Sequence, residues 1–503
     1  MVGIVGVLGR SCAANQSEML KQMSLAIIHR GDEKHVRCLS SEDGFGGIAV
    51  RSRLDCDHSI HASQDGVTVL DHWNASRFVD GRGDIPFRFT DETDPDSSPD
   101  VDPRFLDTLL VSIGETEFSS MRSTFSMKPL YYQCKGPDFV FSTERKAIWR
   151  LGLNEAAELQ PGQLLRVIAG RKPSSRQRER MSRPDTGSPP SHREVIQNLS
   201  TNISGSFRRL RSLRNVGVLF SGGVDSSLAA ILTRDVCKNV ILIAACAEKS
   251  HDDRLTSEVA DRLGMDLLKV RIDAAAVWEI LPELIYAVES SRQLDIEVAL
   301  PFYLAARQAH DAGLSVVISG QGPDELFAGY ARYVETFIRE GEVALDNQLW
   351  NDVIATHRNN IERDERAIEY NQVSAFFPYL DSRFIVTAMS IPSSWKVAQD
   401  AMPDRKLVFR ELAQEMGLPV EIANAPKKAT QYSSGSRRAI AMAVRANARS
   451  KNDSSTVSGN NLVQGALNKI ASEIGIPLVG SLRRNLMVDL TPTMRLVERI
   501  RKV

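Results

Sequence analysis

The stretch of residues 216–227 constrains the fold of this chain more than any other. It opens with the apolar run Val216–Phe220, whose length and content are typical of a buried parallel strand. The triplet Ser221–Gly223 follows and predicts a tight turn that only small residues permit. Residues 226–233 then make a good helix start. A glycine-rich loop therefore joins a strand end to a helix N-terminus.

Such a loop presents backbone N–H groups and the positive end of a helix dipole to an anion. Asp225 lies within the loop and would repel bare phosphate, which favours a bridging Mg²⁺. No Gly-Lys-Ser/Thr sequence follows, so this is not the Walker A pattern. The string resembles the pyrophosphate-binding loop of ATP pyrophosphatases, which cleave ATP to AMP and pyrophosphate. An ordinary strand–turn–helix crossover is the less favoured alternative, because the whole motif matches in its context.

A second glycine-rich loop spans Ser319–Tyr330 and follows the apolar run Leu314–Ile318. It carries the acidic pair Asp324 and Glu325. If both strands belong to one sheet, Asp225 and Asp324 face the same crevice and can share one Mg²⁺ with phosphate oxygens. A helix N-terminus, where the dipole attracts acidic residues, is the alternative for the pair and is compatible with metal binding.

A third cluster occupies residues 426–435, where Lys427 and Lys428 precede a serine- and glycine-rich turn. Two lysines could neutralise negative charge on a transferring phosphoryl or adenylyl group. Taken alone, the cluster is more simply interpreted as a solvated basic turn.

The bulk composition is that of an ordinary globular protein. The chain has 503 residues, 42% hydrophobic and 25% charged, with a formal net charge of -1, so no global field points to nucleic acid or membrane. Its six cysteines form no C-x-x-C pair, which argues against a disulfide framework or a zinc site. The N-terminus lacks a basic n-region and no apolar stretch is long enough to cross a bilayer, so we expect a soluble cytoplasmic protein.

Three segments differ in pattern. Residues 1–170 have short strands and frequent turns and read as a mostly β domain. Residues 171–193 combine charge, proline and serine and read as a linker. Residues 194–503 begin with alternating strands and helices, which predict an α/β domain with a doubly wound parallel sheet, and end in a helical part. The predicted strands are 46–50, 66–70, 139–142, 163–167, 216–220, 240–247, 267–272 and 314–318, and the predicted helices are 17–28, 195–209, 226–233, 256–263, 275–290 and 302–312.

Together these stretches resemble the glutamine-hydrolysing type of asparagine synthetase and its β-lactam synthetase cousins, along nearly the whole chain. Ser221–Ser227, Ser319–Tyr330 and Pro378–Asp381 match the family's synthetase domain with high specificity. The N-terminal match is weaker: Lys128–Tyr132 reads the same as the family's Lys-Pro-Leu-Tyr-Tyr, whereas His29–Asp32 is a degraded His-Arg-Gly-Pro-Asp. The resemblance implies a degenerate glutamine amidotransferase domain of the Ntn-hydrolase-like α+β type, followed by an ATP-pyrophosphatase domain.

The resemblance also implies a carbon–nitrogen ligase that uses ATP and Mg²⁺. In the family, aspartate and Mg·ATP give β-aspartyl-AMP and pyrophosphate, and ammonia then attacks the acyl group. By matching position, Asp225 and Asp324 would hold the Mg²⁺, and Lys428 would stabilise the adenylating phosphate, with Lys427 as the alternative. The ATP contacts implied in the same way are Phe220, Ser221, Gly222, Gly223, Asp225, Ser226, Ser227, Ala245, Ser319 and Gly320.

Departures from the family pattern bear on the nitrogen source and on the base. The family's glutaminase nucleophile is a cysteine at position 2, but Val2 stands here, and an isopropyl group cannot form a thioester. Asp71–Asn74 also replaces an Asn-Gly-Glu glutamine contact. Gln321 replaces a carboxylate thought to take a proton from the nucleophile, which an amide cannot do. Glu325, bulk water or delivery of a neutral amine remain as alternatives.

We therefore expect an ATP-dependent, AMP-forming amide ligase that adenylates aspartate for amidation with ammonia and has lost glutaminase activity. The same chemistry on another carboxylate, as in β-lactam synthetases, is one alternative, and a non-catalytic nucleotide-binding protein is the other. We expect small-molecule partners, no nucleic acid and no membrane. The sequence leaves the oligomeric state open, with a homodimer as one option.

Overall fold

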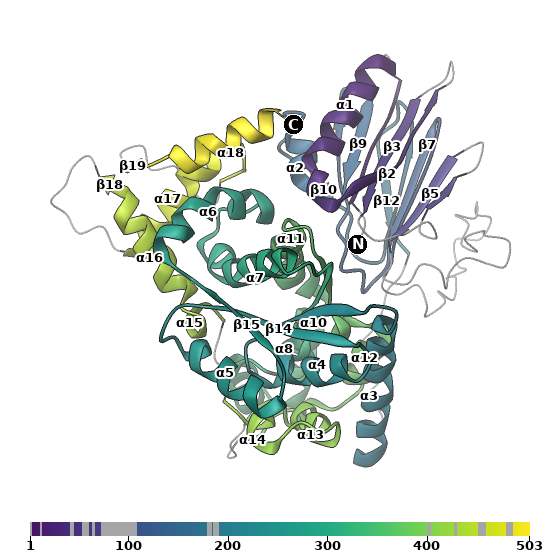
Figure 1. The fold of residues 1–503 in the computed structure, drawn as a ribbon. Helices are drawn as coiled ribbons and strands as arrows, with labels where there is room; N and C mark the ends of the chain where they lie inside the picture. Colours follow the sequence, from purple (N-terminus) through teal and green to yellow (C-terminus); the bar gives the residue numbers. More distant parts are fainter. Residues whose placement is uncertain are drawn as a thin grey trace. The chain divides into compact units, whose positions relative to one another are not determined.

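The chain forms two compact units in the computed structural model, residues 1–182 with 503, and residues 183–502 (Figure 1). Val2, Lys427, Lys428 and residues 72–74, all discussed above, lie outside the residues that the structure describes. Among the described residues, no helix combines the length and the apolar character that crossing a membrane requires. The described residues are 3–10, 13–40, 45–52, 60–62, 66–71, 108–178, 184, 191–399, 404–426, 430–450, 459–478 and 486–502.

The first unit contains two six-stranded antiparallel sheets. Their strand orders are β10-β8-β9-β1-β3-β2 and β12-β11-β7-β6-β5-β4. The strands are β1 Gly3–Gly9, β2 Asp32–Ser40, β3 Phe45–Ser52, β4 Ile60–Ala62, β5 Gly66–Asp71, β6 Leu109–Gly114, β7 Glu117–Arg122, β8 Tyr131–Lys135, β9 Asp138–Ser142, β10 Ala157–Glu158, β11 Gln163–Ile168 and β12 Ser174–Gln177. Two α-helices accompany them, α1 Ala13–Ala26 and α2 Arg145–Trp149.

Strand β1 is buried on both faces. Ile4 and Leu8 belong to a core shared with apolar residues of the second sheet, whereas Val5 and Val7 pack with apolar residues of α1, because side chains alternate along a strand. This double burial explains why the first strand is apolar at nearly every position. The structure confirms the mostly β domain that the sequence predicts, and the four predicted strands correspond to β3, β5, β9 and β11.

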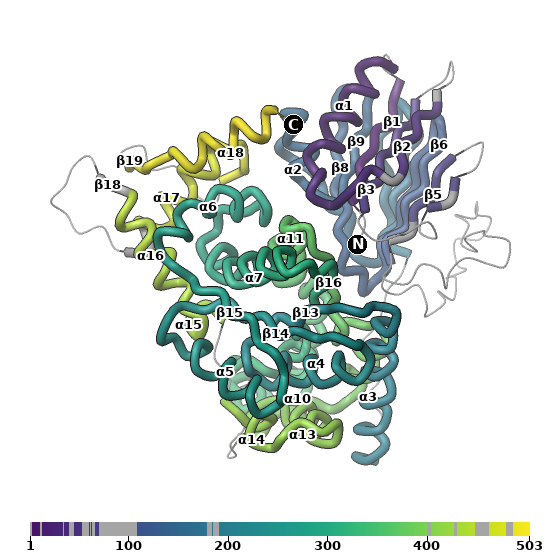
Figure 2. The backbone as a smooth tube through the Cα atoms, viewed as in Figure 1, coloured from purple at the N-terminus to yellow at the C-terminus, as the bar shows by residue number. Residues whose placement is uncertain are grey.

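The second unit is built on a parallel sheet of five strands in the order β15-β14-β13-β16-β17. Helices cover both faces: in Figures 1 and 2, α6, α7 and α11 lie above the sheet, and α4 and α5 lie below it. The strands are β13 Asn215–Leu219, β14 Asn239–Cys246, β15 Leu267–Arg271, β16 Val316–Ile318 and β17 Ser374–Phe376. A small antiparallel pair, β18 Ala448–Ser450 and β19 Leu486–Val488, lies outside this sheet.

The helices of this unit dominate its C-terminal half, which confirms the predicted class. They are α3 His192–Phe207, α4 Val224–Arg234, α5 His251–Leu263, α6 Ala274–Val288, α7 Gln293–Asp311, α8 Pro323–Leu326, α9 Ala331–Glu340, α10 Glu342–Thr356, α11 Glu362–Glu369, α12 Ser382–Met389, α13 Leu407–Glu415, α14 Val420–Ala423, α15 Thr430–Ser433, α16 Ser436–Asn447, α17 Gly459–Glu473 and α18 Thr491–Lys502.

The strand order places the two glycine-rich loops side by side. The chain winds from β13 outward through β14 to β15, then returns to β16 on the other side of β13 and continues to β17. The direction reverses between β13 and β16, and this switch point is where open α/β sheets bind ligands, at the carboxyl ends of the strands. Each glycine-rich loop follows one of these two strands.

Candidate active site

A pocket opens at the carboxyl ends of β13 and β16. Both glycine-rich loops line it, and so do the end of β14, one side of α7 and the segment around α13. Of the residues predicted to form the site, those lining the pocket are Phe220, Ser221, Gly223, Asp225, Ser226, Ala245, Ser319, Gly320, Gln321 and Asp324. Gly222, Ser227 and Glu325 are not among the lining residues.

The first loop is shaped to present backbone N–H groups. Gly222 has a φ of +74°, and a Cβ there would lie 2.9 Å from Leu255 Cγ, so glycine is required on both counts. Ser226 Oγ accepts a hydrogen bond from the Ser221 backbone N–H at 3.2 Å and ties the turn together. Helix α4 starts after Gly223 without a side-chain cap. Its first N–H groups are therefore available to an anion in the pocket.

The second loop packs directly on the first. A Cβ at Gly320 would lie 3.0 Å from the backbone N of Ser226 and 3.1 Å from the carbonyl carbon of Asp225. Only glycine therefore allows the two loops to approach this closely. Ser319 lines the pocket, and its buried hydroxyl has no hydrogen-bond partner in the described part of the chain. A buried hydroxyl without a partner is costly unless something else satisfies it, so it marks a place for a polar ligand.

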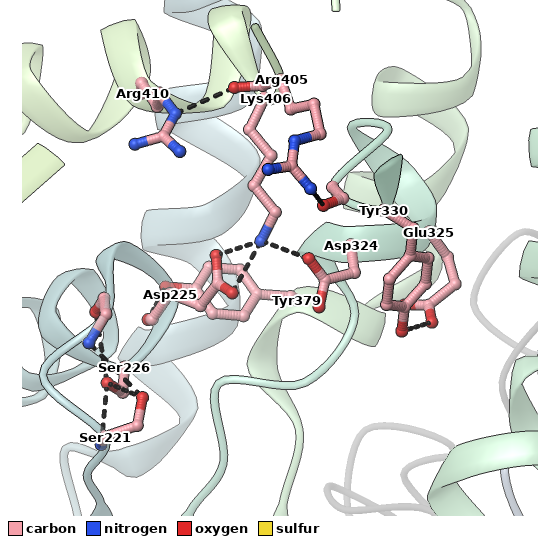
Figure 3. Close-up of polar contacts among 12 residues, drawn as sticks. Ser221, Asp225, Ser226, Asp324, Glu325, Tyr330, Tyr379, Arg405, Lys406 and Arg410 are labelled. Atoms are coloured by element: carbon pink, nitrogen blue, oxygen red, sulfur yellow. Dashed lines mark hydrogen bonds and ion pairs between the residues drawn. The ribbon is translucent and has the colours of Figure 1, made fainter. Parts of the chain in front are cut away.

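One ammonium group links the two predicted metal ligands. Lys406 Nζ lies 2.6 and 2.7 Å from the two carboxylate oxygens of Asp225 and 2.8 Å from Asp324 Oδ1 (Figure 3). Burial lowers the pKa of Lys406 below its usual value, while the charge of Asp225 works in the opposite direction. The two aspartates do face the same crevice.

Two arginines add positive charge on the same side of the pocket. Arg405 donates to the Gly329 carbonyl at 3.2 Å, and Arg410 donates to the Arg405 carbonyl at 2.9 Å and to the Ala425 carbonyl at 3.1 Å. Both arginines line the pocket. Burial lowers the pKa of Arg410, and nearby Asp225 opposes that shift. Because backbone carbonyls hold both guanidinium groups, their charge remains available to an anionic ligand.

The two candidate bases sit in different environments. Gln321 Nε2 donates to Asp364 Oδ2 at 2.6 Å, and the fully buried Asp364 also accepts from Arg363 Nε at 2.7 Å. Glu325 is buried beside the second loop, where it accepts from Tyr330 Oη at 2.7 Å and from Asn360 Nδ2 at 2.8 Å. Burial raises the pKa of Glu325. Figure 3 shows Glu325 and Tyr330 turned towards each other and away from the aspartate pair.

Sequence reasoning missed Lys406, Arg405 and Arg410. They lie between the second loop and the lysine cluster, in a stretch with no glycine turn or motif to single it out. The described residues contain no group of three or more His, Cys, Asp or Glu side chains that could hold a metal ion. The two aspartates would therefore need further oxygen ligands to hold Mg²⁺, which phosphate groups can supply.

A family model named asparagine synthase matches residues 203–343 and 339–469. The chain is 27% identical over 491 residues to the putative asparagine synthetase [glutamine-hydrolyzing] 1 of Methanocaldococcus jannaschii, covering 84% of this chain and 85% of that protein. It is 27% identical over 233 residues to asparagine synthetase B [glutamine-hydrolyzing] of Escherichia coli, covering 44% of this chain and 41% of that protein. A solved NMN synthetase from Francisella tularensis covers 58% of this chain at 13% identity with a TM-score of 0.26, which supports no conclusion.

Proposed function

This chain belongs to the asparagine synthase family, and we propose that it is an ATP-dependent, AMP-forming ligase that activates the side-chain carboxylate of aspartate and joins it to ammonia. The observation that carries the proposal is the pair Asp225 and Asp324, facing one another beside the open N-terminus of α4. Carboxylates beside an anion site serve a metal–phosphate ligand better than either charge alone.

The residues present fit Mg·ATP. Two carboxylates can take part of the metal's coordination, and the N–H groups at the start of α4 with Ser221 can hold the pyrophosphate portion. The unpartnered Ser319 hydroxyl can bind a polar group of the nucleotide. Mg²⁺, when bound, neutralises charge on the phosphate oxygens. Apolar residues of the pocket can cover the adenine base: Ile243, Ala245, Phe302 and Ala305.

Activation needs charge stabilisation rather than a base. The carboxylate oxygen of the acid attacks the α-phosphorus of ATP, and pyrophosphate leaves with its negative charge. Lys406, Arg405 and Arg410 lie where they can neutralise that charge, and Lys428 is proposed to act on the adenylating phosphate. Attack by the amine then forms the amide and releases AMP, and this second step requires loss of a proton.

We propose that glutamine is not the nitrogen donor. Val2 replaces the thiol that the family uses to open glutamine, and no other side chain at that position of the sequence can form a thioester. Gln321, which is held by Asp364, cannot accept the amine proton through its amide. The amine is therefore used as free base or loses its proton to water.

The test is acid-dependent exchange between ATP and labelled pyrophosphate, together with AMP release, across a panel of acids. Each acid is assayed with ammonium, with glutamine and with neither. We expect exchange with aspartate, and AMP and amide formation with ammonium but not with glutamine. Exchange with a different acid would move the substrate assignment to that acid. Absence of exchange with every acid, in protein that binds ATP, would contradict the ligase proposal.

A further inference from the structure

The ammonium group of Lys406 occupies the position that a bridging metal ion needs. Its three contacts, 2.6 and 2.7 Å to Asp225 and 2.8 Å to Asp324, are to carboxylate oxygens of the proposed metal ligands. A cation that reaches one oxygen of each residue must therefore compete with the lysine. One positive charge also cancels half of the pair's negative charge, which weakens its attraction for a second cation.

The arrangement is built into the backbone around Lys406. Its φ is +58°, in the left-handed region, immediately before α13, and its carbonyl accepts from the Arg410 N–H at 2.8 Å. Gly329 leaves the path open: a Cβ there would lie 2.4 Å from Lys406 Cε and 2.0 Å from Asp324 Oδ1. The lysine and the carboxylate meet only because position 329 carries no side chain. Backbone strain at a buried cation is a sign that the position has been selected for a role.

We propose that Lys406 acts as a tethered cation that withholds Asp225 and Asp324 from free divalent metal, so that the metal is admitted only together with the phosphates of the nucleotide. The inference rests on the proposed function, because that proposal makes the two aspartates metal ligands. A polyphosphate brings enough negative charge to accept both the metal and the displaced ammonium, whereas the metal alone would meet like charge. Metal and phosphate affinities are then coupled, and the coupling is reciprocal.

The test measures Mn²⁺ binding by electron paramagnetic resonance on the nucleotide-free full chain, without turnover. We expect weak binding to the wild type and an affinity at least roughly tenfold higher in Lys406→Met, because ligand charge sets divalent-metal affinity. Lys396→Met is the matched control, since Lys396 is another buried lysine that does not line the pocket. We expect it to bind Mn²⁺ like the wild type. Adding Asp225→Asn to Lys406→Met should abolish the gain.

The second arm uses inorganic pyrophosphate. Pyrophosphate should raise the Mn²⁺ affinity of the wild type at least roughly tenfold, and that of Lys406→Met much less, each compared with the same pyrophosphate without protein. This arm decides the question in the wild type even if Lys406→Met fails to fold. Equal Mn²⁺ affinity with and without pyrophosphate in the wild type, or wild-type binding as tight as that of a folded Lys406→Met, overturns the inference. Either result leaves pyrophosphate exchange, which tests the proposed function, to be judged separately.

Discussion

Asp225 and Asp324 are the residues on which the proposed chemistry depends most. Changing either to asparagine keeps its size and removes the charge that the metal and Lys406 both contact. We expect Asp225→Asn and Asp324→Asn each to lower Mg²⁺-dependent AMP formation at least roughly tenfold, about 1.4 kcal/mol in the barrier. Asp235→Asn, at the exposed far end of α4, is the control and should keep its activity. Full activity in either pocket variant would rule out the metal role.

Gln321 and Asp364 must be considered together. Gln321→Glu would place a carboxylate against the Asp364 carboxylate, where Nε2 and Oδ2 now lie 2.6 Å apart. Burial already raises the pKa of Asp364, with Arg363 opposing it. Two adjacent carboxylates cannot both ionise readily, so the pair should keep a proton at neutral pH and give no faster amide formation.

Adding Asp364→Asn to Gln321→Glu supplies an amide donor beside the new carboxylate. That carboxylate can then ionise and take the proton of the attacking amine, which is typically worth a hundredfold, roughly, when the geometry is right. We expect the double variant, and not Gln321→Glu alone, to accelerate ammonium-dependent amide formation at neutral pH. Pyrophosphate exchange serves as the control, because activation needs no base. Acceleration by the single variant would show that Asp364 does not restrain position 321.

At the scale of elements, the turn between β13 and α4 sets the shape of the anion site. Gly222→Ala would force a side chain into a φ of +74° and towards Leu255, so we expect a loss of about 1–3 kcal/mol in the free energy of unfolding. Gly223→Ala is the matched neighbour, because its φ is -76° and a Cβ there meets nothing closer than Ser221 Oγ at 3.5 Å. Urea unfolding of the two variants should separate them. Equal losses would show that the turn tolerates a side chain at both positions.

The sequence predicted those elements whose signals are local. Val216–Phe220 reads as a strand because it is apolar and ends in a glycine turn, and β13 occupies nearly the same residues. Strand β17 was missed because its three residues are too few to show a pattern. The predicted helix 302–312 is only the second part of α7, since Pro301 suggested a helix start and lies inside the helix instead.

The same limit applies to the candidate site. The two glycine loops each carry a readable motif, so their meeting at one crevice follows from predicting a parallel sheet. Lys406 contacts Asp225 across 181 residues of sequence and belongs to no such motif, so only the folded chain brings them together. Glu325 shows the converse, because its acidic neighbour Asp324 enters the site while Glu325 itself is bonded to Tyr330.

On the scale of the whole molecule, the family model matches residues of the second unit, where the proposed site lies. The first unit holds a different concentration of charge. Glu144 is fully buried there and contacts Arg30, Lys146 Nζ at 2.5 Å and His29 Nε2 at 3.0 Å. Such a cluster is destabilising if one partner loses its counter-charge. The first unit should therefore respond to acid, independently of nucleotide.

Burial lowers the pKa of His29 to about 4, although the Glu144 carboxylate raises it and Lys146 lowers it further. The unfolded chain binds a proton at His29 near pH 6.5, whereas the folded unit does not until about pH 4. His29 therefore contributes stability that is fully present above pH 6.5 and is lost as the pH falls towards 4, by at most about 1.4 kcal/mol per pH unit. Urea unfolding between pH 4 and 7 should show a shallower dependence in His29→Gln than in the wild type. His192→Gln, which changes an exposed histidine paired with Glu411, should follow the wild type. Identical slopes in His29→Gln and the wild type would mean that His29 is protonated in the folded unit and already balances Glu144.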